Sequence, residues 1–270
     1  MSSPGSLPDF RCALITGASS GLGLEYALQL APRVEKLVLV ARRENLLEKI
    51  ATDLVEKHPH LRVKTFASDL ANDAGRYHLL NALSQENLYP DFLLNNAGMG
   101  DYGEFHTSDW DKTEQMIRLN MEALTHLTHT LLPGLIARRG AILNVSSLAS
   151  VLPIPDFAVY AATKAYVTSF SEGLRLELRD QGVRVLAVCP GPIKTGFGDV
   201  ARRSTTSDLP VKEAFYVRAD KVVRDSLNAL LADRPRIYPG LKIAAAATLI
   251  GLLPMAAVRL IMAGRPRRSD

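Results

Sequence analysis

The segment from residue 12 to residue 23 reads Cys12-Ala-Leu-Ile-Thr-Gly-Ala-Ser-Ser-Gly-Leu-Gly23, an apolar run followed at once by a glycine-rich turn. After it, Leu24, Ala27 and Leu28 recur at helical spacing. Such glycines let a backbone turn tightly and approach a pyrophosphate, and the first N–H groups of the helix attract phosphate charge. The segment therefore predicts a phosphate-binding strand, turn and helix, although an ordinary glycine-rich turn stays open.

A second constellation lies in the middle of the chain. Tyr160 and Lys164 are four residues apart, so a helix brings them onto one face. An ammonium beside a phenol favours the phenolate and lowers the tyrosine pKa from its usual value of about 10. Ser147 precedes Tyr160 by thirteen residues, and its hydroxyl could hold the same substrate oxygen. Taken alone, however, Tyr-x-x-x-Lys also occurs by chance on surface helices.

Apolar runs and helical periodicities alternate along the chain, which predicts an α/β fold with a parallel sheet and helices on both faces. The chain has 270 residues, 47% of them hydrophobic, which suits one α/β domain with a full core, here placed at residues 1–240. The residues singled out fall at the carboxyl ends of strands, where open sheets of this kind bind ligands. We expect strands near 12–16, 36–40, 62–67, 91–95, 141–145 and 183–188 with a weak one near 236–238, and helices near 21–31, 44–57, 73–86, 109–132, 156–180 and 219–232.

These motifs together resemble the short-chain dehydrogenase/reductase family, in its single-domain branch, over about residues 10 to 238. The glycine-rich turn is similar to the family's cofactor loop, and Asn95-Asn-Ala-Gly98 to its motif after the fourth strand. Pro190-Gly-Pro-Ile-Lys-Thr195 resembles the motif on the nicotinamide side. The resemblance implies a doubly wound Rossmann fold with a seven-stranded sheet. It also implies a catalytic tetrad, consisting of Asn120, Ser147, Tyr160 and Lys164.

The end of the second strand bears on the choice of cofactor. NAD enzymes usually place an acidic residue there, whereas this chain has Arg42 and Arg43. A guanidinium suits a 2′-phosphate, so we expect NADP(H), unless the two arginines merely begin a solvated helix. Asp69 resembles the family's adenine-contacting aspartate, and it could also cap the following helix. The predicted cofactor-binding set is Gly17, Ser19, Ser20, Gly21, Leu22, Gly23, Arg42, Arg43, Asp69, Leu70, Asn96, Ala97, Gly98, Tyr160, Lys164, Pro190, Gly191, Ile193 and Thr195.

The resemblance implies hydride transfer between nicotinamide and a ketone or secondary alcohol, with Tyr160 exchanging the proton of the oxygen. Lys164 would hold the nicotinamide ribose, and Asn120 a water that links Lys164 to solvent. Ser146 competes with Ser147 for the substrate oxygen, and the thirteen-residue offset favours Ser147. Thr195 would bind the carboxamide or cap a helix. A non-catalytic cofactor-sensing or scaffold protein is the alternative function.

Two segments lie outside the common pattern. Residues 195–218 form an irregular stretch that we interpret as a substrate lid, with Phe197, Phe215 and Tyr216 as apolar contacts. Residues 241–270 form an apolar helical extension with a basic tail that includes Arg265, Arg267 and Arg268. Its uncharged run from 243 to 258 would span about 24 Å as a helix, short of a bilayer core of roughly 30 Å. It is expected to cover the substrate pocket, a partner subunit or, peripherally, a membrane surface.

Composition narrows the function classes further. The chain has a net charge of +4 with scattered cations and no nucleic-acid motif, and its histidines are too spread to suggest a metal. Two cysteines, Cys12 and Cys189, would lie on strands that are not neighbours in a 3-2-1-4-5-6 sheet, so no disulfide is expected. No signal peptide is apparent, so a cytoplasmic location is expected. Small residues on the 156–180 helix, a common subunit contact in this family, suggest a homodimer or homotetramer.

Overall fold

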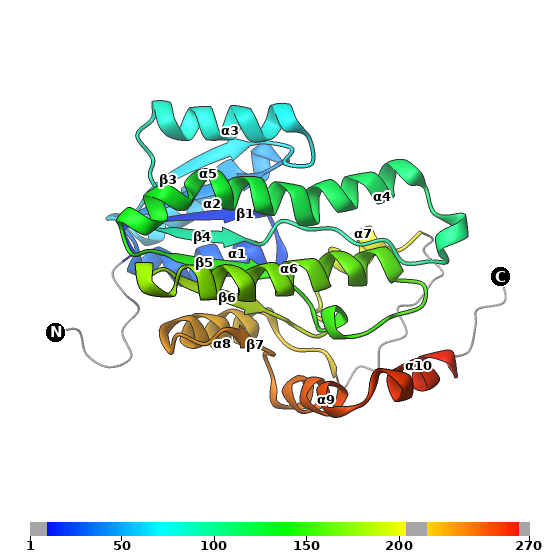
Figure 1. The fold of residues 1–270 in the computed structure, drawn as a ribbon. Coiled ribbons are helices and arrows are strands. Elements are labelled where there is room, and N and C mark those ends of the chain that lie inside the picture. The colour runs from blue at the N-terminus through cyan, green and yellow to red at the C-terminus, as the bar shows by residue number, and fades with distance from the viewer. Residues whose placement is uncertain (1–9, 204–214, 265–270) are drawn as a thin grey trace.

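Seven parallel strands form one sheet in the order β3-β2-β1-β4-β5-β6-β7 (Figure 1). The structure is a computed structural model and describes residues 10–203 and 215–264. The chain order of the strands reverses between β1 and β4, which lie side by side, and this switch point is where such sheets bind ligands. The predicted doubly wound parallel sheet is confirmed. Its strands are β1 (Cys12–Thr16), β2 (Lys36–Ala41), β3 (Arg62–Ala67), β4 (Phe92–Asn95), β5 (Ala141–Val145), β6 (Arg184–Val188) and β7 (Arg236–Ile237).

Helices cover both faces of the sheet because successive strand residues point to opposite sides. Ile15 packs with the helices of one face and Leu14 with those of the other. The first face carries α1 (Gly21–Leu30), α2 (Glu44–Lys57) and α8 (Ala219–Leu231). The second carries α3 (Asp73–Gln85), α5 (Leu124–Ala137) and α6 (Ala158–Glu177).

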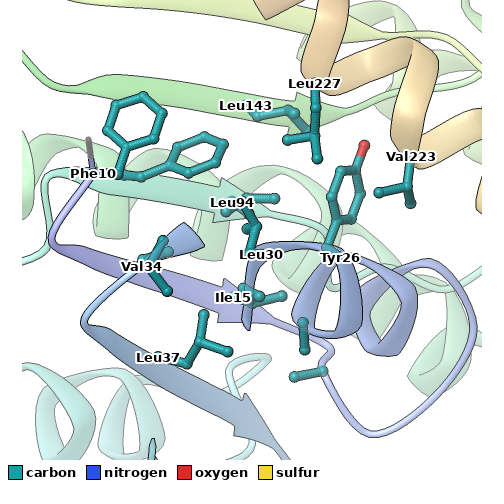
Figure 2. Close-up of a cluster of buried hydrophobic side chains, with 14 of the residues drawn as sticks. Phe10, Ile15, Tyr26, Leu30, Val34, Leu37, Leu94, Leu143, Val223 and Leu227 are labelled. Atoms are coloured by element: carbon teal, nitrogen blue, oxygen red, sulfur yellow. The ribbon is translucent and has the colours of Figure 1, made fainter. Parts of the chain in front are cut away.

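The core of the first face includes Phe10 and packs α8 against the sheet (Figure 2). Phe10 lies just before β1 and stacks on Phe92 of β4, with ring centroids 4.5 Å apart. Tyr26 of α1 is fully buried beside Val223 and Leu227 of α8. This packing fixes α1, and with it the turn that precedes α1, relative to the sheet.

The predicted helix 109–132 has two features that its pattern did not reveal. It consists of α4 (Trp110–Ile117), a π-helical turn (Arg118–Ala123) and α5, which continues through Pro133 to Ala137. Our expectation that the helix ends near residue 132 is wrong, because it continues to Ala137. Pro133 removes one backbone hydrogen-bond donor, which disfavours the helix. Burial of Leu135 in the core stabilises one more helical turn and outweighs this loss. The helix ends where Gly140 N–H bonds to Leu135 O at 2.9 Å.

Beyond β7 the chain forms two further helices, α9 (Leu241–Leu252) and α10 (Met255–Ala263), past the β7 edge of the sheet (Figure 1). They meet at Pro254 and are bent by 116°. Within the described residues, no single helix is long and apolar enough to cross a membrane. The two helices of this bent pair, taken together, reach the necessary length and apolar composition. The basic residues of the tail, Arg265, Arg267 and Arg268, lie outside the described residues.

Candidate active site

The glycine-rich turn between β1 and α1 has the conformation that its sequence predicts. Gly17 and Gly21 adopt positive φ values of 68° and 57°, which favour glycine. A Cβ on Gly23 would lie 2.2 Å from Gly17 O, so the first turn of α1 packs directly on the preceding loop. Ser20 is the residue before α1, and Leu22 packs its side chain against the core. The free N–H groups at the start of α1 therefore lie beside this turn.

Polar groups join this turn to the end of β4. The Asn96 side-chain amide donates to Thr16 O at 2.8 Å and to Gly17 O at 3.3 Å. In return, Thr16 Oγ1 accepts the backbone N–H groups of Asn96 at 3.0 Å and Ala97 at 2.9 Å. Asn96 and Ala97 thus set the shape of the glycine-rich turn across the switch point of the sheet.

The end of β2 reaches the same turn through a guanidinium. Arg43 Nη2 donates to Ser19 Oγ and to Ser20 Oγ, both at 2.9 Å. Arg43 also immediately precedes α2, so it does begin a helix, but its side chain is directed to the glycine-rich turn. Arg42 is exposed beside it. Cationic and hydroxyl donors therefore gather beside the N-terminus of α1.

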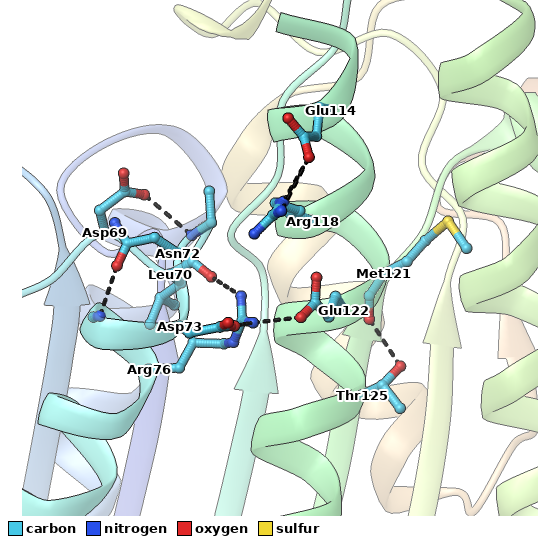
Figure 3. Close-up of polar contacts among 12 residues, drawn as sticks. Asp69, Leu70, Asn72, Asp73, Arg76, Glu114, Arg118, Met121, Glu122 and Thr125 are labelled. Carbon is cyan, nitrogen blue, oxygen red and sulfur yellow. Dashed lines mark hydrogen bonds and ion pairs between the residues drawn. The ribbon is translucent and has the colours of Figure 1, made fainter. Parts of the chain in front are cut away.

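Asp69 and Leu70 form the loop that follows β3 (Figure 3). The Asp69 carboxylate accepts from Ala71 N at 3.1 Å. The helix cap of α3 is Asn72, whose Oδ1 accepts from Gly75 N at 2.7 Å, so the alternative that Asp69 caps this helix is wrong. Asn72 sits at the position before the first helical residue, where a short polar side chain best reaches the free N–H groups.

Sequence reasoning missed the buried Arg76, which fixes this loop. Its guanidinium is 1% exposed, donates to Leu70 O at 2.9 Å, and pairs with Asp73 and, at 2.5 Å, with Glu122 of the π-helical turn (Figure 3). It therefore ties the predicted cofactor loop to the segment that carries Asn120. The signal was available: Arg76 shares a helical face with the buried Leu79 and Leu83, which is unusual for an arginine.

Asn120 is buried within the π-helical turn and makes three hydrogen bonds. Its amide donates to Met99 O at 2.9 Å and to Thr163 Oγ1 at 3.0 Å, and its Oδ1 accepts from Met99 N at 2.9 Å. A Cβ on Gly98 would lie 3.2 Å from Asn120 Oδ1 and 3.3 Å from Lys164 Nζ, so these groups converge. The water that Asn120 is expected to hold stays a prediction.

Tyr160 and Lys164 are both buried on α6. Lys164 Nζ donates to Val145 O at 2.9 Å and lies 5.7 Å from the centroid of the Tyr160 ring. Burial lowers the pKa of Lys164 to about 8. Burial also raises the pKa of Tyr160 to about 12, against a lowering by its hydrogen bond with Ser147. The expected net lowering of the tyrosine pKa is therefore wrong for the protein alone, because the cost of desolvating a phenolate exceeds the opposing interactions.

The two adjacent serines have different surroundings. Ser146 is buried, donates to Lys164 O at 2.8 Å and contacts Thr168 Oγ1 at 2.7 Å, so its hydroxyl is used to hold α6. Ser147 begins the short helix Leu148–Val151 and accepts from Ala149 N at 3.1 Å. Because its hydroxyl also bonds Tyr160, Ser147 is the serine that can share a substrate oxygen with the tyrosine.

The motif after β6 closes the other side of the site. Pro190 O accepts from Leu148 N at 2.8 Å, which ties the motif to the Ser147 segment. Thr195 Cβ lies 3.5 Å from the position of a Cβ on Gly21, so the motif reaches the glycine-rich turn. Thr195 Oγ1 also accepts from Phe197 N, the first residue of the short α7 (Phe197–Ala201), at 3.4 Å, although the N-cap position of α7 is Gly196. Ile193 packs against the core and pairs with Val217.

Gly191 in this motif is covered by the C-terminal extension. A Cβ on Gly191 would lie 2.5 Å from Ile243 Cδ1, so Ile243 of α9 rests directly on the glycine. Helix α9 also contacts the 148–151 helix that follows Ser147. The part of the extension nearest the sheet therefore packs beside the predicted site, as one of our alternatives expected.

Aromatic rings surround Tyr160. Phe157 stacks on it with centroids 4.3 Å apart, and Phe197 lies 5.6 Å away at a tilt. Tyr102 meets Phe157 edge-on at 5.7 Å. The sequence analysis did not identify Phe157 and Tyr102, although Phe157 lies three residues before Tyr160, at the start of the same helix. Of the three aromatic residues expected in the lid, only Phe197 contacts Tyr160 among the described ring contacts.

The described part of the predicted lid is anchored by a buried ion pair. The Asp101 carboxylate accepts from Arg203 at 2.5 Å and lies 3.0 Å from Lys112 Nζ. Burial would raise the pKa of Asp101, but hydrogen bonds from Arg203 and Lys112 hold it below its usual value. Residues 204–214, including Ser204 and Pro210 of the lid sequence, lie outside the described residues.

A glycine-rich turn at the switch point, with a Tyr–Lys pair across from it, defines a nucleotide-dependent oxidoreductase site. Among the described residues no cluster of His, Cys, Asp or Glu could hold a metal, and both cysteines are free and buried.

Comparison with known proteins narrows this class. A family model described as short chain dehydrogenase matches residues 11–205. The very-long-chain 3-oxoacyl-CoA reductase of Rattus norvegicus is 35% identical over 216 residues, covering 78% of this chain and 68% of the relative. The chain belongs to the short-chain dehydrogenase/reductase family, and it is an enzyme that acts on CH–OH and C=O groups.

Two solved structures resemble this one over almost their whole length. A short-chain dehydrogenase from Sphingobium yanoikuyae in complex with NADPH is 31% identical with a TM-score of 0.80, covering 96% of this chain and 98% of that one. A bulky-bulky ketone specific alcohol dehydrogenase from Comamonas testosteroni is 26% identical with a TM-score of 0.75, covering 97% and 98%. The likeness therefore includes the C-terminal extension.

Proposed function

We propose that this enzyme uses NADPH to reduce a bulky, apolar ketone, with long-chain 3-oxoacyl thioesters as the first substrate class to test. The observation that carries the proposal is the position of Tyr160, which bonds Ser147 and contacts the rings of Phe157 and Phe197. The rat relative is named as a 3-oxoacyl-CoA reductase and the Comamonas enzyme as specific for bulky ketones. Both names support an apolar ketone here.

The preference for NADPH rests on Arg43 and its neighbours. The Arg43 guanidinium and the hydroxyls of Ser19 and Ser20 form a group of donors at the end of β2, and the first turn of α1 contains no acidic side chain. Such donors match a 2′-phosphate, with Arg42 available beside them. Bound there, the cofactor supplies the hydride. The NADPH complex of the Sphingobium relative supports this choice.

The chain's own residues then manage the proton. With a pKa near 12, Tyr160 is protonated at neutral pH and can donate to the carbonyl oxygen as charge develops on it. Ser147 orients that oxygen. Lys164 can return a proton to the tyrosine because its pKa is near 8, close to neutral pH. Asn120 holds the Met99 loop and α6 at fixed positions around this lysine.

The aromatic residues around Tyr160 favour an apolar substrate. Phe157 and Phe197 present ring surfaces next to the phenol, and Met99 and Ile154 pack with them. An acyl chain that replaces water on these surfaces gains about 0.8 kcal/mol for each buried CH₂ group. The ratio kcat/KM should therefore rise with chain length until the apolar surface is covered.

The test is NADPH consumption with 3-oxoacyl thioesters of increasing chain length, together with a fluorescence titration of NADPH against NADH. Tyr160→Phe should abolish turnover while it retains NADPH binding. Tyr166→Phe is the matched control on α6, because this hydroxyl bonds Thr125 away from the site. Turnover that survives in Tyr160→Phe would contradict the proposed role, and rates that do not change with chain length would contradict the substrate class.

Arg43→Gln tests the cofactor choice separately. It should weaken NADPH binding by tenfold or more, about 1.4 kcal/mol, and leave NADH binding unchanged. The control is Arg33→Gln, since Arg33 is an exposed arginine before the opposite end of β2. Equal losses for both nucleotides would mean that Arg43 supports the turn rather than a 2′-phosphate.

A further inference from the structure

Exposed apolar side chains gather on the two C-terminal helices. Of the sixteen large hydrophobic residues exposed among the described residues, six fall between residues 241 and 261. Their exposed fractions run from 52% to 90%. We call this set the α9–α10 surface: Leu241, Leu249, Leu252, Met255, Leu260 and Ile261.

Contacts on the inner side fix this pair of helices to the domain. Ile243, Ala247 and Val258 are at most 5% exposed, and Ile243 rests on Gly191. On α9, Leu241 and Leu252 are eleven residues apart, close to three full turns, so they share the outer side. The buried inner side chains therefore fix the two helices to the domain, while the outer apolar side chains stay exposed among the described residues.

The charged side chains of the C-terminal segment itself, up to residue 269, have one sign. Lys242 and Arg259 are exposed on the two helices, and neither forms an ion pair with a described carboxylate. From residue 234 to residue 269 the sequence contains no Asp or Glu. A partner of complementary charge is therefore anionic. A second copy of this chain would bring the same cations together, which like-charge repulsion disfavours.

The lengths of α9 and α10 fit helices that lie on a membrane surface rather than helices that span a bilayer. By residue count α9 is about 18 Å long and α10 about 14 Å, well short of a bilayer core of roughly 30 Å, and the bend of 116° breaks their direction. Short helices with apolar outer sides and flanking cations lie in the interface of anionic bilayers, with the apolar side chains below the headgroups.

We propose that the α9–α10 surface docks this enzyme onto an anionic phospholipid bilayer. The six apolar side chains insert at the headgroup boundary, and Lys242 and Arg259 contact lipid phosphates. Because α9 rests on Gly191, docking places the bilayer beside the predicted site. Docking does not depend on which ketone the enzyme reduces.

The test is co-sedimentation of the full chain with vesicles of phosphatidylcholine, with and without about a quarter phosphatidylglycerol. The chain should bind the anionic vesicles at least tenfold more tightly, and high salt should weaken this binding. The double variant Leu252→Ser/Leu260→Ser should lower the partition coefficient by tenfold or more. Leu176→Ser, at 74% exposure on α6, is the matched control and should bind as the wild type does.

Three outcomes would overturn the proposal. The first is equal binding to neutral and anionic vesicles. The second is a loss of vesicle binding in Leu176→Ser equal to that of the double variant. The third is the absence of vesicle binding together with a dimer, seen by light scattering, that the double variant dissociates, since the surface would then be a subunit interface. All the substituted leucines are exposed, and thermal melts of each variant will verify that the fold is intact.

Discussion

Replacing Arg76 with methionine removes the guanidinium that joins the Asp69–Leu70 loop to the π-helical turn. Methionine fills much of the buried stem, so the change deletes the polar contacts while creating little cavity. The hydrogen bond to Leu70 O is lost, and so are the pairs with Asp73 and Glu122.

The magnitude follows from the exposure of each partner. A hydrogen bond from a charged group contributes about 1.5–3 kcal/mol. Asp73 and Glu122 are 64% and 50% exposed, so water screens these pairs and each adds at most about 1 kcal/mol. Against this, Arg76 Nε is buried without a partner, and removing that desolvated group recovers about 1–2 kcal/mol. We expect a net loss of about 2 kcal/mol, or about 4–8 °C in Tm.

The assay is thermal unfolding combined with NADPH titration. Arg76→Met should melt at a lower temperature and bind NADPH more weakly, because the loop that carries Asp69 loses its anchor. Arg118→Met is the control, since the ion pair of Arg118 is with the partly exposed Glu114, one turn away on the same helical segment, and not with the Asp69–Leu70 loop (Figure 3). A melt of Arg76→Met equal to wild type would show that desolvation cancels the contacts. An equal shift in the Arg118 control would show that the effect is not specific to the buried site.

Further predictions concern the lysine, the covered glycine and the aromatic stack. Lys164 titrates near 8 in the fold and near 10.5 when unfolded, so charging it costs the fold roughly 3 kcal/mol as pH falls from 10.5 to 8. Urea unfolding should show wild type losing stability relative to Lys164→Met over this range, and parallel curves would contradict the shift. Gly191→Ala should displace α9 and lower Tm, and adding Ile243→Ala should restore part of the loss because the three atoms nearest to the added Cβ all belong to Ile243. A double variant whose loss in Tm equals the sum of the two single losses would contradict this contact. Phe157→Ala should lower kcat/KM about tenfold for long-chain ketones and little for small ones, from the area lost. An equal loss of kcat/KM for both ketones would show that Phe157 only positions Tyr160 and does not contact the substrate.

The sheet was predictable because its strands are short apolar runs at regular spacing. The spacing of apolar residues indicates where strands and helices lie, and the glycines mark the turn where the chain passes from strand to helix. The π-helical turn at 118–123 was not predictable, since its apolar pattern is close to that of an ordinary helix. The continuation of the helix from residue 132 to Ala137 was not predictable either, because Pro133 locally disfavours a further turn and only the burial of Leu135 in the folded core favours it.

The residues of the candidate site could be found from the sequence, but their electrostatics could not. Spacing alone placed Tyr160 and Lys164 on one helix face. Whether the lysine lowers the tyrosine pKa depends on burial and on where the ammonium points, and it points to Val145 O. Arg76 was overlooked because its partners, Leu70 and Glu122, are distant from each other in sequence, so only the fold shows that one guanidinium contacts both.

The bonds between Asn96 and the glycine-rich turn have a consequence for affinity. Fixing the backbone of one residue costs about 1–2 kcal/mol of conformational entropy. Because Thr16 and Gly17 are already bonded to Asn96, that ordering occurs when the chain folds and not when nucleotide arrives. More of the intrinsic binding energy of a nucleotide then remains as measured affinity. A side chain at the end of β4, outside the turn itself, thereby preorganises the phosphate site.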